Sequence, residues 1–220
     1  VHSRSIRMII MKKLVDDLVS TYAKLSLHSA NEAETRKKLI DRVLEQVLGW
    51  TDDDISYEER VSEDGSTTFA DYIIRTADIS ILIEAKRIGK AFSLVPDKKK
   101  VKLSGSFLQG ETGSAIKQAR EYCRKKSIPF AVVTNGSQWI IFPAVRTDSV
   151  SFSDSNAIIF DSIERALGEE LTEFTDLLSR SGVIEGNLAV QLIGRNTDQF
   201  EERRLNKFFK GGHSKRENPI

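Results

Sequence analysis

The stretch Ile79-Ser80-Ile81-Leu82-Ile83-Glu84-Ala85-Lys86-Arg87 decides which fold we expect. Its first part is rich in branched apolar side chains and predicts a buried strand. Alternate side chains of a strand share a face, so we expect Glu84 and Lys86 to point the same way. A carboxylate and an ammonium are costly to desolvate at the end of a buried strand. This strand end is therefore a candidate functional site.

A second apolar run, Phe69-Ala70-Asp71-Tyr72-Ile73-Ile74, places another carboxylate thirteen positions before Glu84. Short turns at 63–66 and 76–78 separate this run from its neighbours on either side. We therefore predict an antiparallel meander of three strands, Ile55–Val61, Phe69–Arg75 and Ile79–Arg87.

The rest of the chain surrounds this meander with helices and further strands. Apolar spacing predicts amphipathic helices at Lys12–Leu25 and at Asn31–Leu48, the second with Glu34 in a capping box. Ile88–Gly113 is expected to be a long connection, and Asn187–Ile193 stays undecided. The remaining predicted elements are helices Ser114–Lys126, Ser162–Gly168, Leu171–Ser179 and Gln199–Phe209, strands Phe130–Thr134 and Trp139–Val145 around a tight turn at Asn135-Gly136, and a short edge strand Ala157–Phe160.

This order predicts an α/β fold with a mixed β-sheet flanked by helices on both faces and extra C-terminal helices. We divide the chain into an N-terminal extension and helix (1–30), a core (31–160), C-terminal helices (161–209) and a disordered tail (210–220). Residues 1–10 look like an upstream extension, and we place no function there.

Composition limits the class of protein. The 220 residues are 40% hydrophobic and 30% charged, with a net charge of only +1, so any attraction to nucleic acid must come from local patches. The single Cys123 excludes an internal disulfide and a cysteine-based metal site, and favours the cytoplasm. No run approaches the length of a membrane span, so we expect no membrane partner.

Asp71 and Glu84, at the ends of neighbouring strands, predict a site for one hard divalent cation. Mg²⁺ prefers oxygen ligands and needs only one or two protein carboxylates plus substrate phosphate; we expect Mn²⁺ to substitute for it. Lys86 could position the attacking water or neutralise developing negative charge. This chemistry suits phosphodiester hydrolysis. The alternative is an Asp–Lys–Glu ion-pair cluster that only stabilises the sheet.

Asp71, a gap of twelve residues and then Glu84-Ala85-Lys86 resemble the PD-(D/E)xK nuclease signature. Ala70 stands where the family often has proline. Further motifs, from Asn31 to Phe142, follow the order of the nuclease domain at the amino end of type I restriction enzyme R subunits. These are Asn31–Arg36 with Leu39–Asp41 and Leu48–Trp50, the QxxxY motif Gln118–Tyr122, and Phe130–Gly136 followed by Trp139.

The resemblance implies a restriction-endonuclease-like fold and a Mg²⁺-dependent deoxyribonuclease. By it, Asp71 and Glu84 are metal ligands and Lys86 is the catalytic lysine. Glu32 is the acid of the first helix, and Gln118 and Tyr122 support the site or contact DNA. The implied partners are DNA and other restriction-modification subunits, and double-strand cleavage favours a homodimer or larger complex.

Each supporting residue has an ordinary alternative. Gln118 and Tyr122, at i and i+4 of a helix, also fit a half-buried contact. Glu32 also fits a solvated acid in a first helical turn, with Glu34 as the fallback for the site.

Basic segments are candidates for DNA contacts. Lys98, Lys99, Lys100 and Lys102 follow the Glu84–Lys86 strand, where they could lie along DNA phosphates or simply form a solvated loop. The basic tail from Arg203 to Arg216 suits the same role. Gly105–Thr112 has P-loop spacing, but Glu111 replaces the lysine and would repel phosphates, so we reject a P-loop there. The rest of the 220 residues leaves no room for a helicase or ATPase motor, so we expect none in this chain.

One alternative function stays open, a catalytically inactive nuclease-fold module for DNA binding or for docking to restriction-modification subunits. The residues do not distinguish DNA from RNA, and they give no base or methylation specificity.

Overall fold

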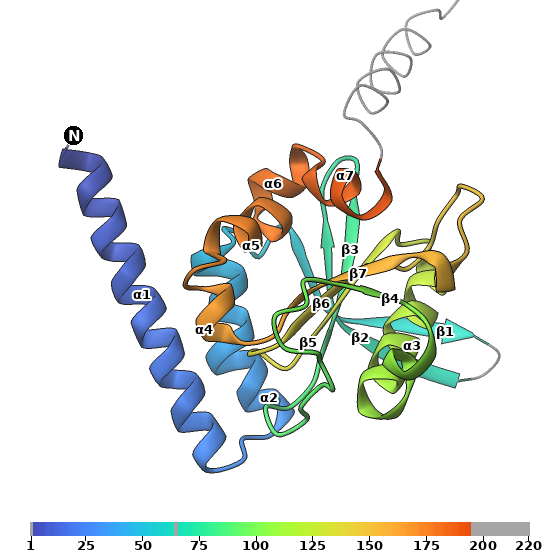
Figure 1. Cartoon of the computed structure of the whole chain (residues 1–220), viewed down its shortest axis with the longest axis horizontal. Coiled ribbons are helices and arrows are strands. Elements are labelled where there is room, and N and C mark those ends of the chain that lie inside the picture. Colours follow the sequence, from blue (N-terminus) through green and yellow to red (C-terminus); the bar gives the residue numbers. More distant parts are fainter. Residues whose placement is uncertain (1, 64–65, 195–220) are drawn as a thin grey trace, which may run out of the picture.

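The computed structural model describes residues 2–63 and 66–194. A mixed seven-stranded sheet, in the order β1-β2-β3-β5-β6-β7-β4, is flanked by helices (Figure 1). Its strands are β1 (Ile55–Glu63), β2 (Ser66–Arg75), β3 (Ser80–Ala85), β4 (Lys100–Lys102), β5 (Phe130–Thr134), β6 (Trp139–Pro143) and β7 (Asn156–Phe160). The expected mixed α/β class is confirmed.

The predicted meander is also confirmed. Strands β1, β2 and β3 pair antiparallel in sequence order, and β3 then pairs parallel with β5. The chain leaves β3, forms β4 at the far edge of the sheet, and returns through helix α3 (Gly110–Lys126) to β5. Strands β3 and β5 are buried almost throughout, which explains their continuous apolar sequence.

Two separate apolar cores lie on the two faces of the sheet, as a sheet flanked by helices on both faces requires. Helix α3 covers one face, where Ile116 and Ala119 pack with Leu82 and Val133. The other face carries the helical segment 32–47 and the C-terminal helices, and α1 (His2–Leu27) packs on the outside of these helices (Figure 1). Those helices are α4 (Ile163–Ala166), α5 (Leu171–Leu178), α6 (Arg180–Ile184) and α7 (Asn187–Ile193).

The first helix is longer than predicted. Helix α1 begins at His2 rather than Lys12, so most of the expected extension is helical. Its early turns leave Ile6, Ile9 and Ile10 exposed. Because these three isoleucines face solvent, they do not form the inward stripe from which a helix is inferred.

The second helix covers the predicted range, but most of it is not α-helical. A short α2 (Glu32–Thr35) continues into the π-helical segments η1 (Arg36–Ile40) and η2 (Val43–Val47). The apolar pattern could not reveal this, because bonding to i+4 or to i+5 places much the same residues on the inner face.

The connection after β3 is more ordered than predicted. It contains β4 and the 3₁₀ turn η3 (Gly105–Leu108), and α3 begins at Gly110 rather than Ser114. Gly113 was predicted to end a loop, but it lies inside helix α3. A side chain cannot be accommodated there, because a Cβ would lie 2.0 Å from the Leu108 carbonyl oxygen.

The C-terminal part of the described residues differs from the prediction at β7, α6 and α7. The predicted strand at Ala157–Phe160 is present as β7, but its predicted position at the edge of the sheet is wrong, because β4 pairs with its outer side. Helix α6 was not predicted, and the undecided segment 187–193 is helix α7. The predicted last helix and the basic tail lie outside the described residues.

Candidate active site

The two predicted metal ligands lie side by side where β2 and β3 part. The antiparallel ladder between these strands ends at the pair Tyr72 and Ile83. Asp71 and Glu84 are the next residues on the two strands. The Asp71 carboxylate accepts the Ala85 N–H at Oδ2 over 2.8 Å, so a side chain replaces the backbone acceptor at this point. The structure therefore brings the two acids together.

A chain of hydrogen bonds joins β3 to α3. Lys86 Nζ donates to Glu84 Oε1 at 2.6 Å and to Gln118 Oε1 at 3.2 Å. Gln118 Nε2 donates in turn to the Tyr122 hydroxyl at 3.1 Å. Glu84 and Lys86 thus share a face, and the helix pair Gln118–Tyr122 lies beside them, as predicted.

Glu84 carries an unsatisfied oxygen. Its side chain is only 3% exposed, and Oε2 has no hydrogen-bond partner among the described residues. Burial, and next the charge of Asp71, raise the pKa of Glu84 to about 7. A buried carboxylate oxygen without a donor is costly unless another group binds it.

Lys86 is held as a cation. Burial alone would lower its pKa, but the neighbouring carboxylates of Glu84, Glu32 and Asp71 outweigh burial and raise the pKa above its ordinary value. Lys86 is therefore an ammonium near neutral pH. It suits donating hydrogen bonds and compensating negative charge better than accepting a proton.

Arg36 is a site residue that our reading of the sequence missed. Its Nη1 donates to Asp71 Oδ1 at 3.1 Å and to Glu58 Oε1 at 3.2 Å. Its Nε donates to the Tyr72 hydroxyl, and the guanidinium lies 4.9 Å from the Tyr72 ring centroid. The sequence did carry a signal: Arg36 precedes the inward-facing Leu39 by three positions and Ile40 by four, which places it on the same side of the helix as these core residues.

Helix α2 brings Glu32, rather than Glu34, toward the site. Buried Thr35 accepts the Ile88 N–H at 3.1 Å, which fixes α2 to the chain just beyond Lys86. Partial burial and the charge of Asp71 raise the pKa of Glu32, while Lys86 opposes this shift. Glu34 instead pairs with Lys38. Its backbone N–H donates to the Asn31 side chain, which caps the helix.

Backbone strain marks the strand next to Asp71. Glu58 lies in β1 with φ of 49°, between the paired residues Tyr57↔Tyr72 and Glu59↔Ala70. A non-glycine residue rarely adopts this conformation, and such strain concentrates at functional sites. Here it accompanies the contact between Glu58 and Arg36.

The charges around the two acids do not balance. The groups that contact Asp71 and Glu84 or shift their pKa values are Arg36, Lys86, Glu32 and Glu58. With the two acids, these make four carboxylates and two cations, an excess of two negative charges when all are ionised.

A two-carboxylate site fits this arrangement better than a closed metal cage. No group of three or more His, Cys, Asp or Glu side chains within residues 2–63 and 66–194 could hold a metal ion. Mg²⁺ does not need one, because it retains waters and shares its coordination with substrate phosphates. The unsatisfied Glu84 Oε2 and the negative excess are the features that a divalent cation would complement.

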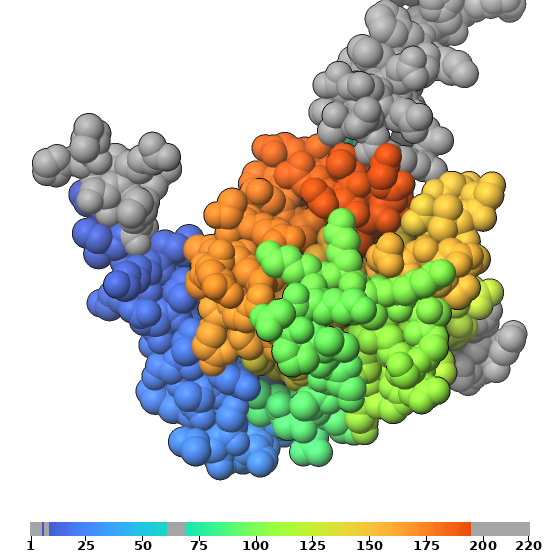
Figure 2. All heavy atoms as spheres, viewed as in Figure 1, coloured from blue at the N-terminus to red at the C-terminus, as the bar shows by residue number. Residues whose placement is uncertain are grey.

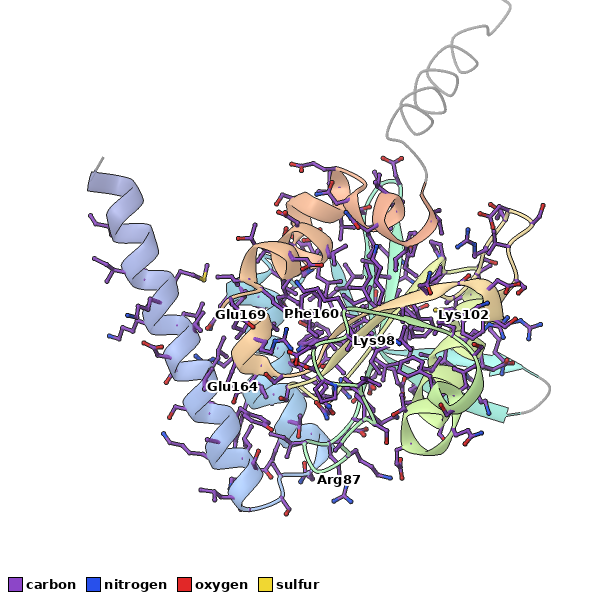
Figure 3. All side chains as sticks on the ribbon, viewed as in Figure 1. Arg87, Lys98, Lys102, Phe160, Glu164 and Glu169 are labelled. Carbon is purple, nitrogen blue, oxygen red and sulfur yellow. The ribbon has the colours of Figure 1, made fainter. Side chains whose placement is uncertain are left out.

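The lysine run lies far from this site. Strand β4 is separated from β3 by β5, β6 and β7, which at one strand spacing each places it about 19 Å away across the sheet. Figure 3 shows Arg87 at the lower edge of the molecule, well away from Lys98 and Lys102. The run therefore does not border the two acids, and its contact with DNA phosphates stays a prediction.

Only part of the lysine run is available to a nucleic acid. Lys99 pairs with Glu170 and Glu173, and Lys102 pairs with Asp154. Lys98 and Lys100 are exposed and form no ion pair within the described part of the chain. Arg87 is exposed directly after Lys86, so it is better placed to contact a substrate near the two acids.

Comparisons with protein-family models, with curated proteins and with solved structures found no match. The helices of the described residues include none with both the length and the apolar character needed to cross a membrane. The geometry of the site and the motifs of the sequence are therefore the grounds for a functional proposal.

Proposed function

We propose that this chain is a Mg²⁺-dependent nuclease of the PD-(D/E)xK type, with a restriction-endonuclease-like fold, that hydrolyses phosphodiester bonds in DNA. One observation carries the proposal. A buried, partnerless carboxylate oxygen of Glu84 lies at a strand end beside Asp71, within one hydrogen-bonded unit with Lys86. Stabilising the sheet would not require that unsatisfied oxygen.

The residues divide the chemistry between them. Asp71 and Glu84 would hold the cation, which when bound supplies Lewis-acid stabilisation of the phosphodiester and lowers the pKa of a bound water. Lys86, kept protonated by its carboxylate neighbours, orients the attacking water or compensates charge that develops on the phosphate. Gln118 accepts a hydrogen bond from the Lys86 ammonium and holds it in position, and Tyr122 in turn accepts a hydrogen bond from Gln118.

The order of motifs supports a restriction-type context for this activity. The resemblance to type I restriction enzyme R subunits suggests DNA as the substrate and other restriction-modification subunits as partners. Cleavage of both strands would need two such sites, hence a homodimer or a larger complex.

The test is cleavage of supercoiled plasmid in Mg²⁺ by the wild type and by Asp71→Asn, Glu84→Gln and Lys86→Met. We expect each substitution to reduce the rate about 100-fold or more, as loss of a metal ligand or a charge-stabilising group does. The matched control is Asp78→Asn, because Asp78 lies in the turn at the other end of the β2–β3 hairpin. Cleavage that persists in all three variants contradicts the proposal, and a labelled RNA run in parallel tests the choice of nucleic acid.

A second candidate is an inactive nuclease-fold module that binds DNA or docks to other subunits. The ion pairs Glu84–Lys86 and Arg36–Asp71 favour it, because each acid already has a cationic partner without a metal. Calorimetric titration with Mn²⁺ separates the two functions. If the protein is a nuclease, the wild type binds Mn²⁺ and Glu84→Gln does not. If it is an inactive module, no Mn²⁺ binding depends on the carboxylates.

A further inference from the structure

Arg36 occupies the oxygen of Asp71 that a cation would need. Asp71 Oδ2 accepts the backbone N–H of Ala85, which belongs to the sheet, and Oδ1 accepts Arg36 Nη1 at 3.1 Å, so Oδ1 is the oxygen that a side-chain movement would open. Both side chains are mostly buried, at 17% exposed for Arg36 and 13% for Asp71. Their attraction is therefore less screened than that of a surface ion pair.

Arg36 also has a path away from Asp71. Its second carboxylate partner, Glu58, has a side chain that is 69% exposed, so the guanidinium borders solvent on that side. The Tyr72 hydroxyl and ring hold the other side of the guanidinium. A planar guanidinium donates two parallel hydrogen bonds to phosphate as readily as to carboxylate.

We propose that Arg36 couples substrate binding to cation binding: its guanidinium holds Asp71 in the free protein and transfers to a backbone phosphate of the nucleic acid when the cation binds. This inference rests on the proposed nuclease function. In the free protein, Arg36 supplies part of the positive charge that the negative site needs, and so competes with the cation. A bound nucleic acid removes this competition by giving Arg36 a phosphate partner. Cation and substrate then bind cooperatively, and each strengthens the binding of the other by the same factor.

The test is the affinity for Mn²⁺, measured by calorimetry with and without a saturating duplex whose phosphorothioate linkages resist cleavage. For Arg36→Gln we expect about tenfold tighter Mn²⁺ binding in the free protein, since a positive charge at contact distance is removed. We also expect the duplex to improve Mn²⁺ affinity strongly in the wild type and much less in this variant. Cleavage by the variant should nevertheless fall, because the phosphate loses a cationic partner.

Two further variants complete the design. Arg42→Gln is the matched control, because Arg42 belongs to the same helical region but pairs with Asp17, and we expect wild-type behaviour. Arg36→Lys keeps the charge but loses the planar fork. It should bind Mn²⁺ with an affinity between those of the wild type and Arg36→Gln, with a smaller duplex effect, and it keeps the test open if the neutral variant does not fold.

The outcomes separate this inference from the function on which it rests. Unchanged or weaker Mn²⁺ binding in both Arg36 variants, in a wild type that binds Mn²⁺, overturns the coupling role and leaves the nuclease proposal standing. Absence of Mn²⁺ binding in the wild type and in the variants alike overturns both.

Discussion

At the residue scale, Glu84 sets the pH dependence that we expect for cation binding. Burial, and next the charge of Asp71, raise its pKa from 4.5 to about 7, so the carboxyl is largely protonated at pH 6 and cannot serve as a ligand. Below pH 7, Mn²⁺ affinity should therefore fall by up to about tenfold per pH unit, and above pH 8 it should level off. Calorimetric titrations between pH 5.5 and 8.5 measure this, and a flat profile across the range would contradict it.

We expect the same residue to make the metal-free protein less stable at high pH. An acid whose pKa rises on folding loses its proton first in the unfolded chain, so stability decreases as pH rises from about 4.5 to about 7. Glu84→Gln removes this loss, and at pH 8 without metal we expect it to raise the free energy of unfolding by about 1 to 3 kcal/mol. Urea unfolding at pH 5 and pH 8 checks this, with the exposed Glu111→Gln as the control. A variant less stable than the wild type at pH 8 would argue that Glu84 has a structural role.

At the scale of elements, Thr35 attaches helix α2 to the chain that follows strand β3. Thr35→Val keeps the shape but leaves the buried Ile88 N–H without an acceptor. We expect a loss of about 1 to 3 kcal/mol in the free energy of unfolding, the cost of an unsatisfied buried donor. Thr175→Val is the control, because that hydroxyl bonds only to carbonyls of its own helix. Chemical denaturation measures both, and equal losses would contradict a special role for Thr35.

The sequence predicted the strands of the site better than its helices. Alternation along β3 correctly placed Glu84 and Lys86 on one face, because the direction of a strand side chain depends only on its position. The contacts of Arg36 were not predicted, because its partners lie on β1 and β2 and depend on how the helix packs against these strands. Strand β4 was missed because it has only three residues, two of them lysines, and so shows no apolar pattern.

At the scale of the whole molecule, one arginine fastens the segment after β3 to the C-terminal helices. Arg165 pairs with Asp97 in that segment and with Asp161, Glu169 and the nearly buried Glu170. Lys99 joins the same network through Glu170. Figure 2 shows green residues that follow β3 in contact with the orange residues of the C-terminal helices.

We expect Arg165→Gln to lower the Tm and to speed hydrogen exchange in residues 88–102. The reason is that Glu170, with a side chain only 5% exposed, would keep Lys99 as its sole charged partner among the described residues, at 3.5 Å. Hydrogen exchange read by mass spectrometry localises the effect. Arg124→Gln, which removes a surface pair with Glu121, should leave both quantities unchanged. Equal protection of 88–102 in the two variants would show that the network does not hold the segment.

The parallel pairing of β3 with β5 has a consequence for the order in which the chain folds. Each hairpin of the meander closes a short loop, whereas Ile81 meets Phe130 only after 49 positions of chain are brought together. Closing the longer loop costs more chain entropy and slows the pairing. We expect the two acids to meet early, within the β2–β3 hairpin. Lys86 would gain its α3 neighbours in a later kinetic phase, so a nascent chain would carry both acids before the lysine is in place.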